Sequence, residues 1–152
     1  MKNLEDLRKL SAFKSVSSLI ALEIVPVNDS AKSGIEHAID FFEGVIATTK
    51  SLTNPEGNYV ILEDENLRKI LEIAGYSSSN KNILQQKEGI IEVTEKFEKY
   101  LGRLRVLEKN PRKFYCEDYG KRRNLLKVCE DMANYFEGKV DEETRMQCNS
   151  ED

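Results

Sequence analysis

The feature that most constrains the fold of this chain is a set of apolar residues that recur three or four positions apart. The clearest example lies between residues 30 and 53. Because an α-helix turns once in about 3.6 residues, residues at this spacing share one face of a helix. Ser30 or Ser33 is expected to cap the start of this helix, and Asn54-Pro55 to end it. Its predicted face consists of Ile35, Ala38, Ile39, Phe42, Val45, Ile46, Thr49 and Leu52.

Similar spacing predicts helices over residues 3–25, 64–74 and 80–109, and a last helix over residues 111–137. Gly120 offers a point at which the last helix divides into two pieces. The boundaries rest on residues that cap or break helices, which are Asn3, Pro26, Asp64, Gly75, Asn110, Pro111 and Gly138.

Residues 59–62 are a short run with strong β-propensity, Tyr-Val-Ile-Leu. No second run of comparable propensity is present, and a lone strand cannot satisfy its backbone hydrogen-bonding groups. The run is therefore predicted to be an extended connector laid over the core. Five helices without a convincing sheet predict an all-α fold, a single-domain helical bundle.

The predicted helix over residues 80–109 is long for a chain of 152 residues. At about 1.5 Å per residue it spans roughly 45 Å, whereas a compact domain of this size is roughly 40 Å across. The bundle is therefore expected to be somewhat elongated, unless Gly89 or Gly102 bends the helix. We assign the bundle to residues 1–138, and we expect residues 139–152 to form an acidic, flexible tail.

The same long helix repeats apolar residues in a heptad pattern, which packs either in the core of the chain or against a second chain. A wide apolar stripe suits a helix packed on two neighbours, which favours the core. Because the helix is longer than the globule, part of it is available to a second chain, and a homo-oligomer remains an alternative. The candidate interface residues are Phe97, Tyr100, Leu104 and Leu107.

Charges are distributed unevenly along the chain. The net charge is −4, yet residues 101–127 contain nine basic and three acidic side chains. Residues 128–152 contain two basic and eight acidic side chains, which offset that excess. Aromatic residues accompany the basic ones, so the basic segment is a candidate site for a negatively charged partner. The candidate residues are Arg112, Lys113, Tyr115, Tyr119, Lys121, Arg122, Arg123 and Lys127.

Three interpretations of the basic segment stay open. It is the solvated side of a helix, where pairs with Glu117 and Asp118 contribute roughly 0.2–0.5 kcal/mol each. It binds an acidic segment of another protein, because arginine suits bidentate contacts with carboxylates. Or it binds the phosphates of a nucleic acid while a tyrosine stacks on a base. Six neutralised phosphates would make log affinity fall with log salt at a slope of about −5.

Recognisable catalytic and cofactor-binding patterns are absent from the sequence. There is no glycine-rich phosphate loop, no H-E-x-x-H and no G-x-S-x-G. The single histidine, His37, has Glu36, Asp40 and Glu43 nearby but lacks the Glu-x-x-His spacing of carboxylate-bridged metal sites. We therefore expect no enzymatic activity, no cofactor and no metal site.

The cysteines and the apolar runs indicate the cellular compartment in which the chain is expected to lie. Cys116, Cys129 and Cys148 form no C-x-x-C pair, and their odd number argues against a disulfide framework and suits a reducing compartment. Cys116 and Cys129 are expected to be small core side chains. No signal peptide is recognisable, and the apolar run LIALEIVPV is too short to span a membrane. The chain is therefore expected to be intracellular, either cytoplasmic or nuclear, and not membrane-bound.

Together these patterns predict a non-catalytic, all-α interaction protein, such as an adaptor, a subunit or a regulator. It is expected to bind another protein, acidic by charge complementarity, through a helix face and the basic segment. Arg122 and Arg123 are the predicted anchors. The alternative is a nucleic-acid-associated accessory protein that uses residues 101–127.

Overall fold

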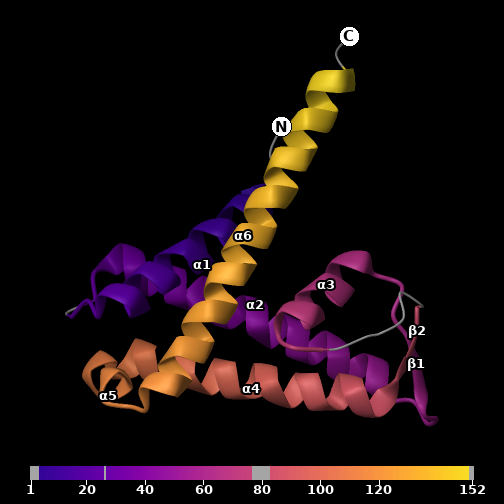
Figure 1. Ribbon diagram of the computed structural model, residues 1–152, viewed down its shortest axis with the longest axis horizontal. Coiled ribbons are helices and arrows are strands. Elements are labelled where there is room, and N and C mark those ends of the chain that lie inside the picture. Colours follow the sequence, from indigo (N-terminus) through magenta and orange to yellow (C-terminus); the bar gives the residue numbers. More distant parts are fainter. Residues whose placement is uncertain (1–3, 26, 77–82, 151–152) are drawn as a thin grey trace. The chain divides into compact units, whose positions relative to one another are not determined.

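The computed structural model describes residues 4–25, 27–76 and 83–150. Within these ranges it contains six helices and two short strands (Figure 1). The helices are α1 (Leu4–Leu22), α2 (Asp29–Thr53), α3 (Glu65–Ile73), α4 (Lys87–Lys109), α5 (Pro111–Tyr115) and α6 (Tyr119–Ser150). The strands are β1 (Tyr59–Ile61) and β2 (Leu84–Gln86). The predicted all-α helical bundle is therefore confirmed.

The chain divides into two compact units. Unit 1 consists of Met1–Ile39 and Leu104–Asp152, and unit 2 consists of Asp40–Arg103. α2 and α4 each contribute residues to both units. The predicted division into a bundle over residues 1–138 and an acidic, flexible tail over residues 139–152 stays a prediction. The predicted boundary residues Asn3 and Pro26 and the predicted helix start at residue 80 lie outside the described residues.

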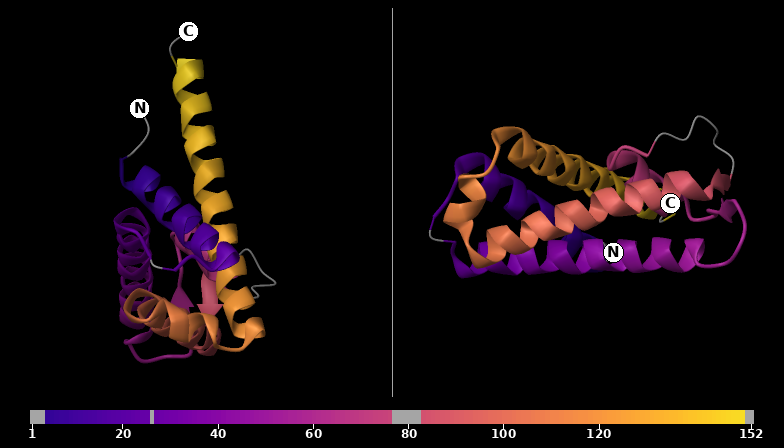
Figure 2. Two further views of the ribbon diagram at one scale, coloured as in Figure 1. Left: turned by 90° about the vertical axis from the view of Figure 1, so that its left-hand side faces the viewer. Right: turned by 90° about the horizontal axis from the view of Figure 1, so that it is seen from below.

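Unit 1 is organised by the packing of α1 against α6, which lie side by side in Figure 2. The rings of Phe13 and Phe136 stack with their centroids 6.0 Å apart. The Nζ atom of Lys14 lies 3.5 Å from a carboxylate oxygen of Glu137 at the surface. Aromatic burial therefore fixes the middle of α6 against α1.

The predicted end of the last helix at Glu137 is wrong, because α6 continues to Ser150. Val140 is buried beyond Gly138, so apolar contacts hold the helix together past the glycine. A glycine stops a helix only where the backbone adopts the left-handed conformation, and Gly138 has a negative φ inside the helix.

Capping residues explain how the chain passes from α5 to α6. Asn110 accepts a hydrogen bond from a backbone N–H of α5, and Pro111 occupies the first turn, as predicted. The chain then leaves the helix at residues 116–118 rather than at Gly120. The carboxylate of Asp118 accepts a hydrogen bond from the N–H of Gly120 at 2.9 Å, which begins α6.

The boundaries of the first and third helices show the same local rules. Asp64 accepts hydrogen bonds from two backbone N–H groups at the start of α3, and Gly75 follows the end of α3 with a φ of +101°. Both residues act as predicted. α1 ends at Leu22 rather than at residue 25, because the backbone turns left-handed at Glu23.

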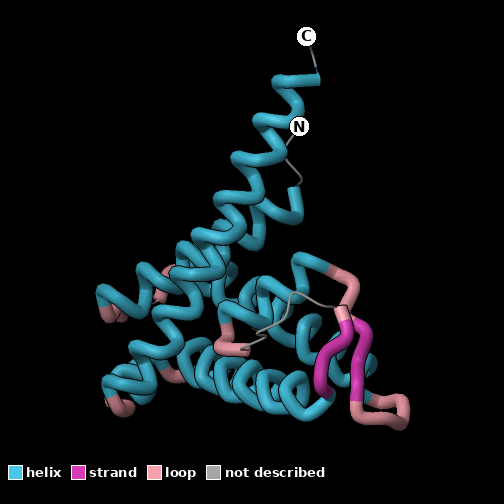
Figure 3. The backbone as a smooth tube through the Cα atoms, turned by 45° about the vertical axis from the view of Figure 1, so that its right-hand side comes forward, coloured by secondary structure: helices cyan, strands magenta, loops and turns pink. Residues whose placement is uncertain are grey.

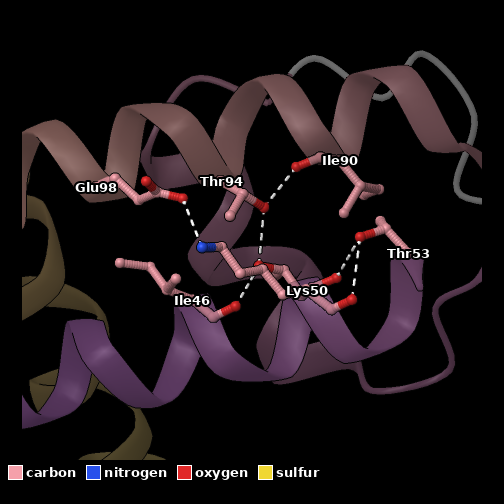
Figure 4. A network of polar contacts seen from close by, with 7 residues as sticks. Ile46, Lys50, Thr53, Ile90, Thr94 and Glu98 are labelled. Carbon is pink, nitrogen blue, oxygen red and sulfur yellow. Dashed lines mark hydrogen bonds and ion pairs between the residues drawn. The ribbon is translucent and has the colours of Figure 1, made fainter.

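In unit 2, a network of polar contacts joins α2 and α4 (Figure 4). The hydroxyls of Thr49 and Thr94, both buried, lie 2.8 Å apart. Each hydroxyl also lies within hydrogen-bonding distance of a carbonyl in its own helix, so neither is left unsatisfied. The ion pair of Lys50 with Glu98, at 3.3 Å, joins the two helices at the surface. Thr49 therefore fits the apolar stripe on which it was predicted.

β1 and β2 pair as an antiparallel ribbon, which corrects the prediction of an unpaired connector (Figure 3). Tyr59 lies opposite Gln86, and Ile61 lies opposite Leu84. β2 falls within the region predicted to begin the long helix, so α4 begins at Lys87. The residues of β2, Leu-Gln-Gln, include no β-branched or aromatic side chain, so propensity alone does not mark them as a strand.

Candidate protein-interaction surface

α1 ends in a Schellman turn in which Glu23 takes the left-handed position. The N–H of Glu23 bonds to the carbonyl of Ile20, and the N–H of Ile24 bonds to the carbonyl of Leu19. Glu23 consequently has a φ of +50°. α3 ends in the same motif, but there the left-handed residue is Gly75. A residue with a side chain costs roughly 1–2 kcal/mol in this conformation, so a compensating contact is expected at Glu23.

Arg122, in the first turn of α6, makes that contact. Its Nη1 atom lies 2.5 Å from a carboxylate oxygen of Glu23. The Arg122 side chain is 13% exposed, and its guanidinium lies 5.6 Å from the ring centroid of Tyr119, a cation–π distance. Its Nε atom is buried without a hydrogen-bond partner in the described residues. Arg122 therefore links α1 to α6, and Glu23 neutralises its charge.

Tyr115, at the end of α5, contacts the same turn at the end of α1. Its hydroxyl donates to the carbonyl of Leu19 at 3.0 Å and lies 3.3 Å from the carbonyl of Ile24. Burial raises the pKa of this hydroxyl above its usual value, and the negative charge of Glu23 raises it further, while Arg122 opposes the shift. Tyr115 is half-buried, and its hydroxyl positions the end of α1.

Four large apolar side chains remain exposed around this junction. They are Leu22, Ile24 and Val25 at the end of α1, and Tyr119 at the start of α6. Leu22 and Tyr119 are 70% and 67% exposed. The Glu23–Arg122 and Tyr115–Ile24 contacts hold the end of α1 beside the start of α6. The four side chains therefore belong to one region of unit 1.

The predicted cations of this region fall into two groups. Arg112, Lys113, Lys121 and Arg123 are exposed, and none forms an ion pair with another described residue. Lys127 is also exposed but pairs with an aspartate one turn later in α6, at 3.3 Å. We name the unpaired cations and the exposed apolar side chains together the basic-apolar surface. It consists of Leu22, Ile24, Val25, Arg112, Lys113, Tyr119, Lys121 and Arg123.

The cations at the start of α6 oppose the helix dipole. The N-terminal end of a helix carries partial positive charge, and each added cation there costs about 0.3–1 kcal/mol when exposed. Lys121 lies in this first turn, which contains no acidic residue, and Arg123 follows directly after it. The acidic residues of α6 lie toward its other end. The carboxylate of Asp118, which accepts from the N–H of Gly120, offsets part of this cost at the start of the helix.

The predicted helix interface lies mainly in the core of the chain. Phe97, Leu104 and Leu107 are buried, and Tyr100 is half-buried. The ring of Phe97 packs within unit 2 against that of Phe42, with centroids 5.4 Å apart. Of the two alternatives for the heptad pattern, burial in the chain itself is therefore the one observed.

Sequence reasoning missed the apolar part of the surface. The spacing that predicts the first helix over residues 3–25 does not show that Leu22, Ile24 and Val25 are exposed. A signal was present in the run LIALEIVPV, because eight of its nine residues are apolar or proline and one helix face cannot bury them all.

Other chemistry finds little support in the described part of the chain. No group of three or more His, Cys, Asp or Glu side chains is placed to hold a metal ion there. Cys129 is buried, and burial raises the pKa of its thiol, so it fits the predicted core role. Cys116 is exposed, which corrects its predicted place in the core. None of the described helices has a stretch long and apolar enough to cross a membrane.

Comparison of the chain with protein-family models, with curated proteins and with solved structures finds no significant match. The geometry of the basic-apolar surface is therefore the basis for assigning a function.

Proposed function

We propose that the chain is a non-catalytic interaction protein that binds an acidic, partly apolar segment of another protein through the basic-apolar surface. The observation that carries this proposal is the exposure of Leu22 and Tyr119 in the region where four exposed cations form no ion pair with another described residue. Apolar contact would supply affinity, and the cations would select an acidic partner.

The apolar part of the surface resembles the centre of a protein interface. Isolated exposed apolar residues are common, but several of them in one region mark interaction sites. Tyrosine and arginine are enriched where binding energy is concentrated. Tyr119 presents an exposed aromatic ring, and the guanidinium of Arg122 lies over one face of it, 5.6 Å from the ring centroid.

The charged part of the surface suits carboxylates. Arg112 and Arg123 each offer a planar guanidinium for bidentate contacts, and Lys113 and Lys121 add positive charge around them. Opposite charge at the rim raises the association rate and selects against basic partners. An amphipathic segment with acidic and apolar residues matches both parts of the surface.

Nucleic acid is the second candidate, because Tyr119 is exposed beside unpaired cations and a base could stack on its ring. Arg122 and Lys127 already have carboxylate partners, so four cations remain for phosphates instead of six. The expected slope of log affinity against log salt is therefore about −3. The exposed aliphatic side chains at the end of α1 contribute nothing to phosphate contacts, which favours the protein partner.

Replacing an apolar residue by a cation separates the two candidates. Leu22→Lys removes apolar contact and adds positive charge. It is expected to weaken binding of a helical peptide with Glu and Leu at three-four spacing by about 10-fold. The same change would leave binding of a single-stranded oligonucleotide unchanged or make it tighter. Lys121→Ala/Arg123→Ala should weaken both ligands.

The matched control is Leu84→Lys, which changes an exposed leucine of unit 2 in the same way. It should leave peptide affinity as it is in the unsubstituted chain. Failure of the peptide to bind at low salt would overturn the proposal. Oligonucleotide binding with a slope of about −3 that Leu22→Lys does not weaken would establish the second candidate instead. Self-association in light scattering that Leu22→Lys abolishes would identify a second copy as the partner.

A further inference from the structure

We infer that the β1–β2 ribbon of unit 2 is a second docking surface, which binds an extended segment of a partner that carries basic side chains. The outer face of the ribbon is apolar. Tyr59, Ile61 and Leu84 are 60%, 58% and 54% exposed. The residues between them in the strands, Val60 and Gln85, point inward and are buried.

The pairing pattern shows which backbone groups are available. The N–H of Lys87 bonds to the carbonyl of Asn58, and the N–H of Leu62 bonds to the carbonyl of Ile83. Hydrogen-bonded pairs alternate along an antiparallel ribbon, so Val60 is the residue of β1 that bonds to β2. The N–H and C=O groups of the residues on either side of it therefore point to the outer edge of β1.

That outer edge has no strand beside it in the described part of the chain, where the sheet has two strands. Natural proteins protect such edges with lysine, proline, bulges or a covering element. Neither strand contains a charged residue or a proline, and the side chains on the outer face are exposed. An apolar edge with free backbone groups is the feature to which extended segments add as a further strand.

The charges around the ribbon select the kind of segment. Residues 55–66 contain four acidic and no basic side chains, and residues 83–95 contain three acidic and one basic. Glu56, Glu63 and Glu88 are exposed and make no ion pair with another described residue. The one cation of these ranges, Lys87, donates to the carbonyl of Pro55. The surroundings of the ribbon therefore attract lysine and arginine side chains.

A pocket at one end of the ribbon offers a place for one such side chain. It has a volume of about 320 Å³. Its lining residues include the apolar Ile91, the aromatic Tyr59 and the acidic Glu88, together with Lys87, whose ammonium donates to the carbonyl of Pro55. An aliphatic stem that ends in a cation matches this lining, because the stem packs on apolar surface while the charge meets a carboxylate. The pocket is lined by Asn58, Tyr59, Gln86, Lys87, Glu88 and Ile91.

The probe for this inference is a capped eight-residue peptide of alternating lysine and valine, titrated against the full chain. Two comparison peptides share its length. One has prolines at two central valine positions, which keeps the charge but prevents strand pairing, and one has glutamate in place of lysine. Binding of the first peptide is expected to slow amide exchange at Tyr59 and Ile61 at least 10-fold, and both comparison peptides should bind at least 10-fold more weakly.

Substitutions in the chain locate the binding site. Ile61→Lys places a charge on the exposed edge and should weaken the lysine-valine peptide at least 10-fold, and Leu84→Lys is a second variant on the same face. Leu22→Lys is the matched control in unit 1 and should have no effect. Circular dichroism checks that each variant is folded.

Three outcomes would overturn the inference. Equal affinity for the proline-containing peptide would show that binding depends on general charge attraction and not on strand pairing. Unchanged affinity in folded Ile61→Lys and Leu84→Lys would place the site elsewhere. Slow exchange at Tyr59 and Ile61 that depends on protein concentration without any peptide would identify a second copy as the occupant. None of these outcomes bears on the basic-apolar surface, so the two proposals fail independently.

Discussion

The guanidinium of Arg122 lies 2.5 Å from the carboxylate of Glu23, a residue 99 positions earlier in the chain that has a left-handed backbone conformation. An unfavourable backbone conformation and a favourable ion pair thus occur at one residue. Glycine would relax the backbone, as Gly75 does after α3, but would remove the carboxylate that pairs with Arg122. The residue type at position 23 is therefore explained by the contact with α6 rather than by the turn.

This balance predicts that the effect of Glu23→Gly depends on Arg122. In the otherwise unchanged chain, the relief of the left-handed strain and the loss of the ion pair, each about 1 kcal/mol, should nearly cancel. In an Arg122→Met background there is no ion pair to lose. Glu23→Gly should then raise the free energy of unfolding by about 1 kcal/mol, as measured by urea denaturation of the four chains.

Glu23→Gln is the control for this cycle, because it keeps the left-handed strain and removes the charge. It should lower the free energy of unfolding by about 0.5–1 kcal/mol in the chain with Arg122, and by less in the Arg122→Met background. Equal effects of Glu23→Gly in both backgrounds would show that the two residues are not energetically coupled.

Local signals explain which parts of the fold could be predicted. Asp64, Gly75 and Asn110 act within a few residues of their position, and their side chains or backbone preferences decide helix boundaries without tertiary contacts. The β1–β2 ribbon was missed because Leu84–Gln86 becomes a strand only by pairing with a segment about 25 residues away. Pairing of this kind overrides weak propensity and is not visible in a single segment.

The candidate site was predictable only in part, for a similar reason. Charge and helical spacing were sufficient to place Arg123 and Lys121 at the surface. The burial of most of Arg122 depends on a contact with Glu23 in another helix, which spacing cannot reveal. The exposure of Leu22 also depends on where α1 ends and on which residues α6 covers. Sequence therefore indicated the basic part of the surface, and packing was needed to find the apolar part.

Two glycines of α4 are predicted to respond oppositely to alanine. A Cβ at Gly89 would lie 2.9 Å from the Cε2 atom of Tyr76, whose hydroxyl is held by Gln85 at 2.6 Å. Gly89→Ala should therefore lower the free energy of unfolding by about 1–3 kcal/mol. Gly102 has open space at this position, so Gly102→Ala should raise the free energy of unfolding by up to about 1 kcal/mol. Stabilisation by both changes would mean that the ring of Tyr76 moves aside freely.

The buried hydroxyl pair in unit 2 is predicted to cost little when it is replaced as a pair. Thr94→Val alone leaves the Thr49 hydroxyl with a carbonyl of its own helix at 3.1 Å, so the loss should be about 1 kcal/mol or less. Thr49→Val/Thr94→Val should cost less than the sum of the single changes, because no buried hydroxyl is left beside a valine. Thr48→Val, at an exposed position of α2, is the control and should change stability by less than about 0.5 kcal/mol. A double variant that loses more than the sum would contradict this account.

The cysteines are predicted to differ sharply in reactivity. Cys116 is exposed, whereas Cys129 is buried and has a raised pKa, caused first by burial and then by the charge of Glu130. In a Cys148→Ser chain, Ellman's reagent should label Cys116 at once and Cys129 only when the protein unfolds. Cys116→Ser in the same background identifies the slow thiol. Rapid labelling of Cys129 in the native chain would mean that the packing around this part of α6 opens readily.

The Tyr115 hydroxyl is predicted to make stability depend on alkaline pH. Its pKa in the folded chain lies above the ordinary value of 10.0. The unfolded chain therefore loses this proton first as the pH rises, and the stabilising contribution declines as the pH passes through the folded pKa. Below about pH 10 the contribution is complete, and Tyr115→Phe should lower the free energy of unfolding by about 0.5–1.5 kcal/mol, the worth of the lost hydrogen bonds to α1. Above that pH the difference in unfolding free energy between the two chains should shrink, because only the unsubstituted chain carries this group.

Tyr59→Phe, at an exposed position of β1, is the control for titration of the other tyrosines. Denaturation curves measured in steps from about pH 8 to pH 11 test the sign, and a gap that widens with pH would contradict the account of Tyr115.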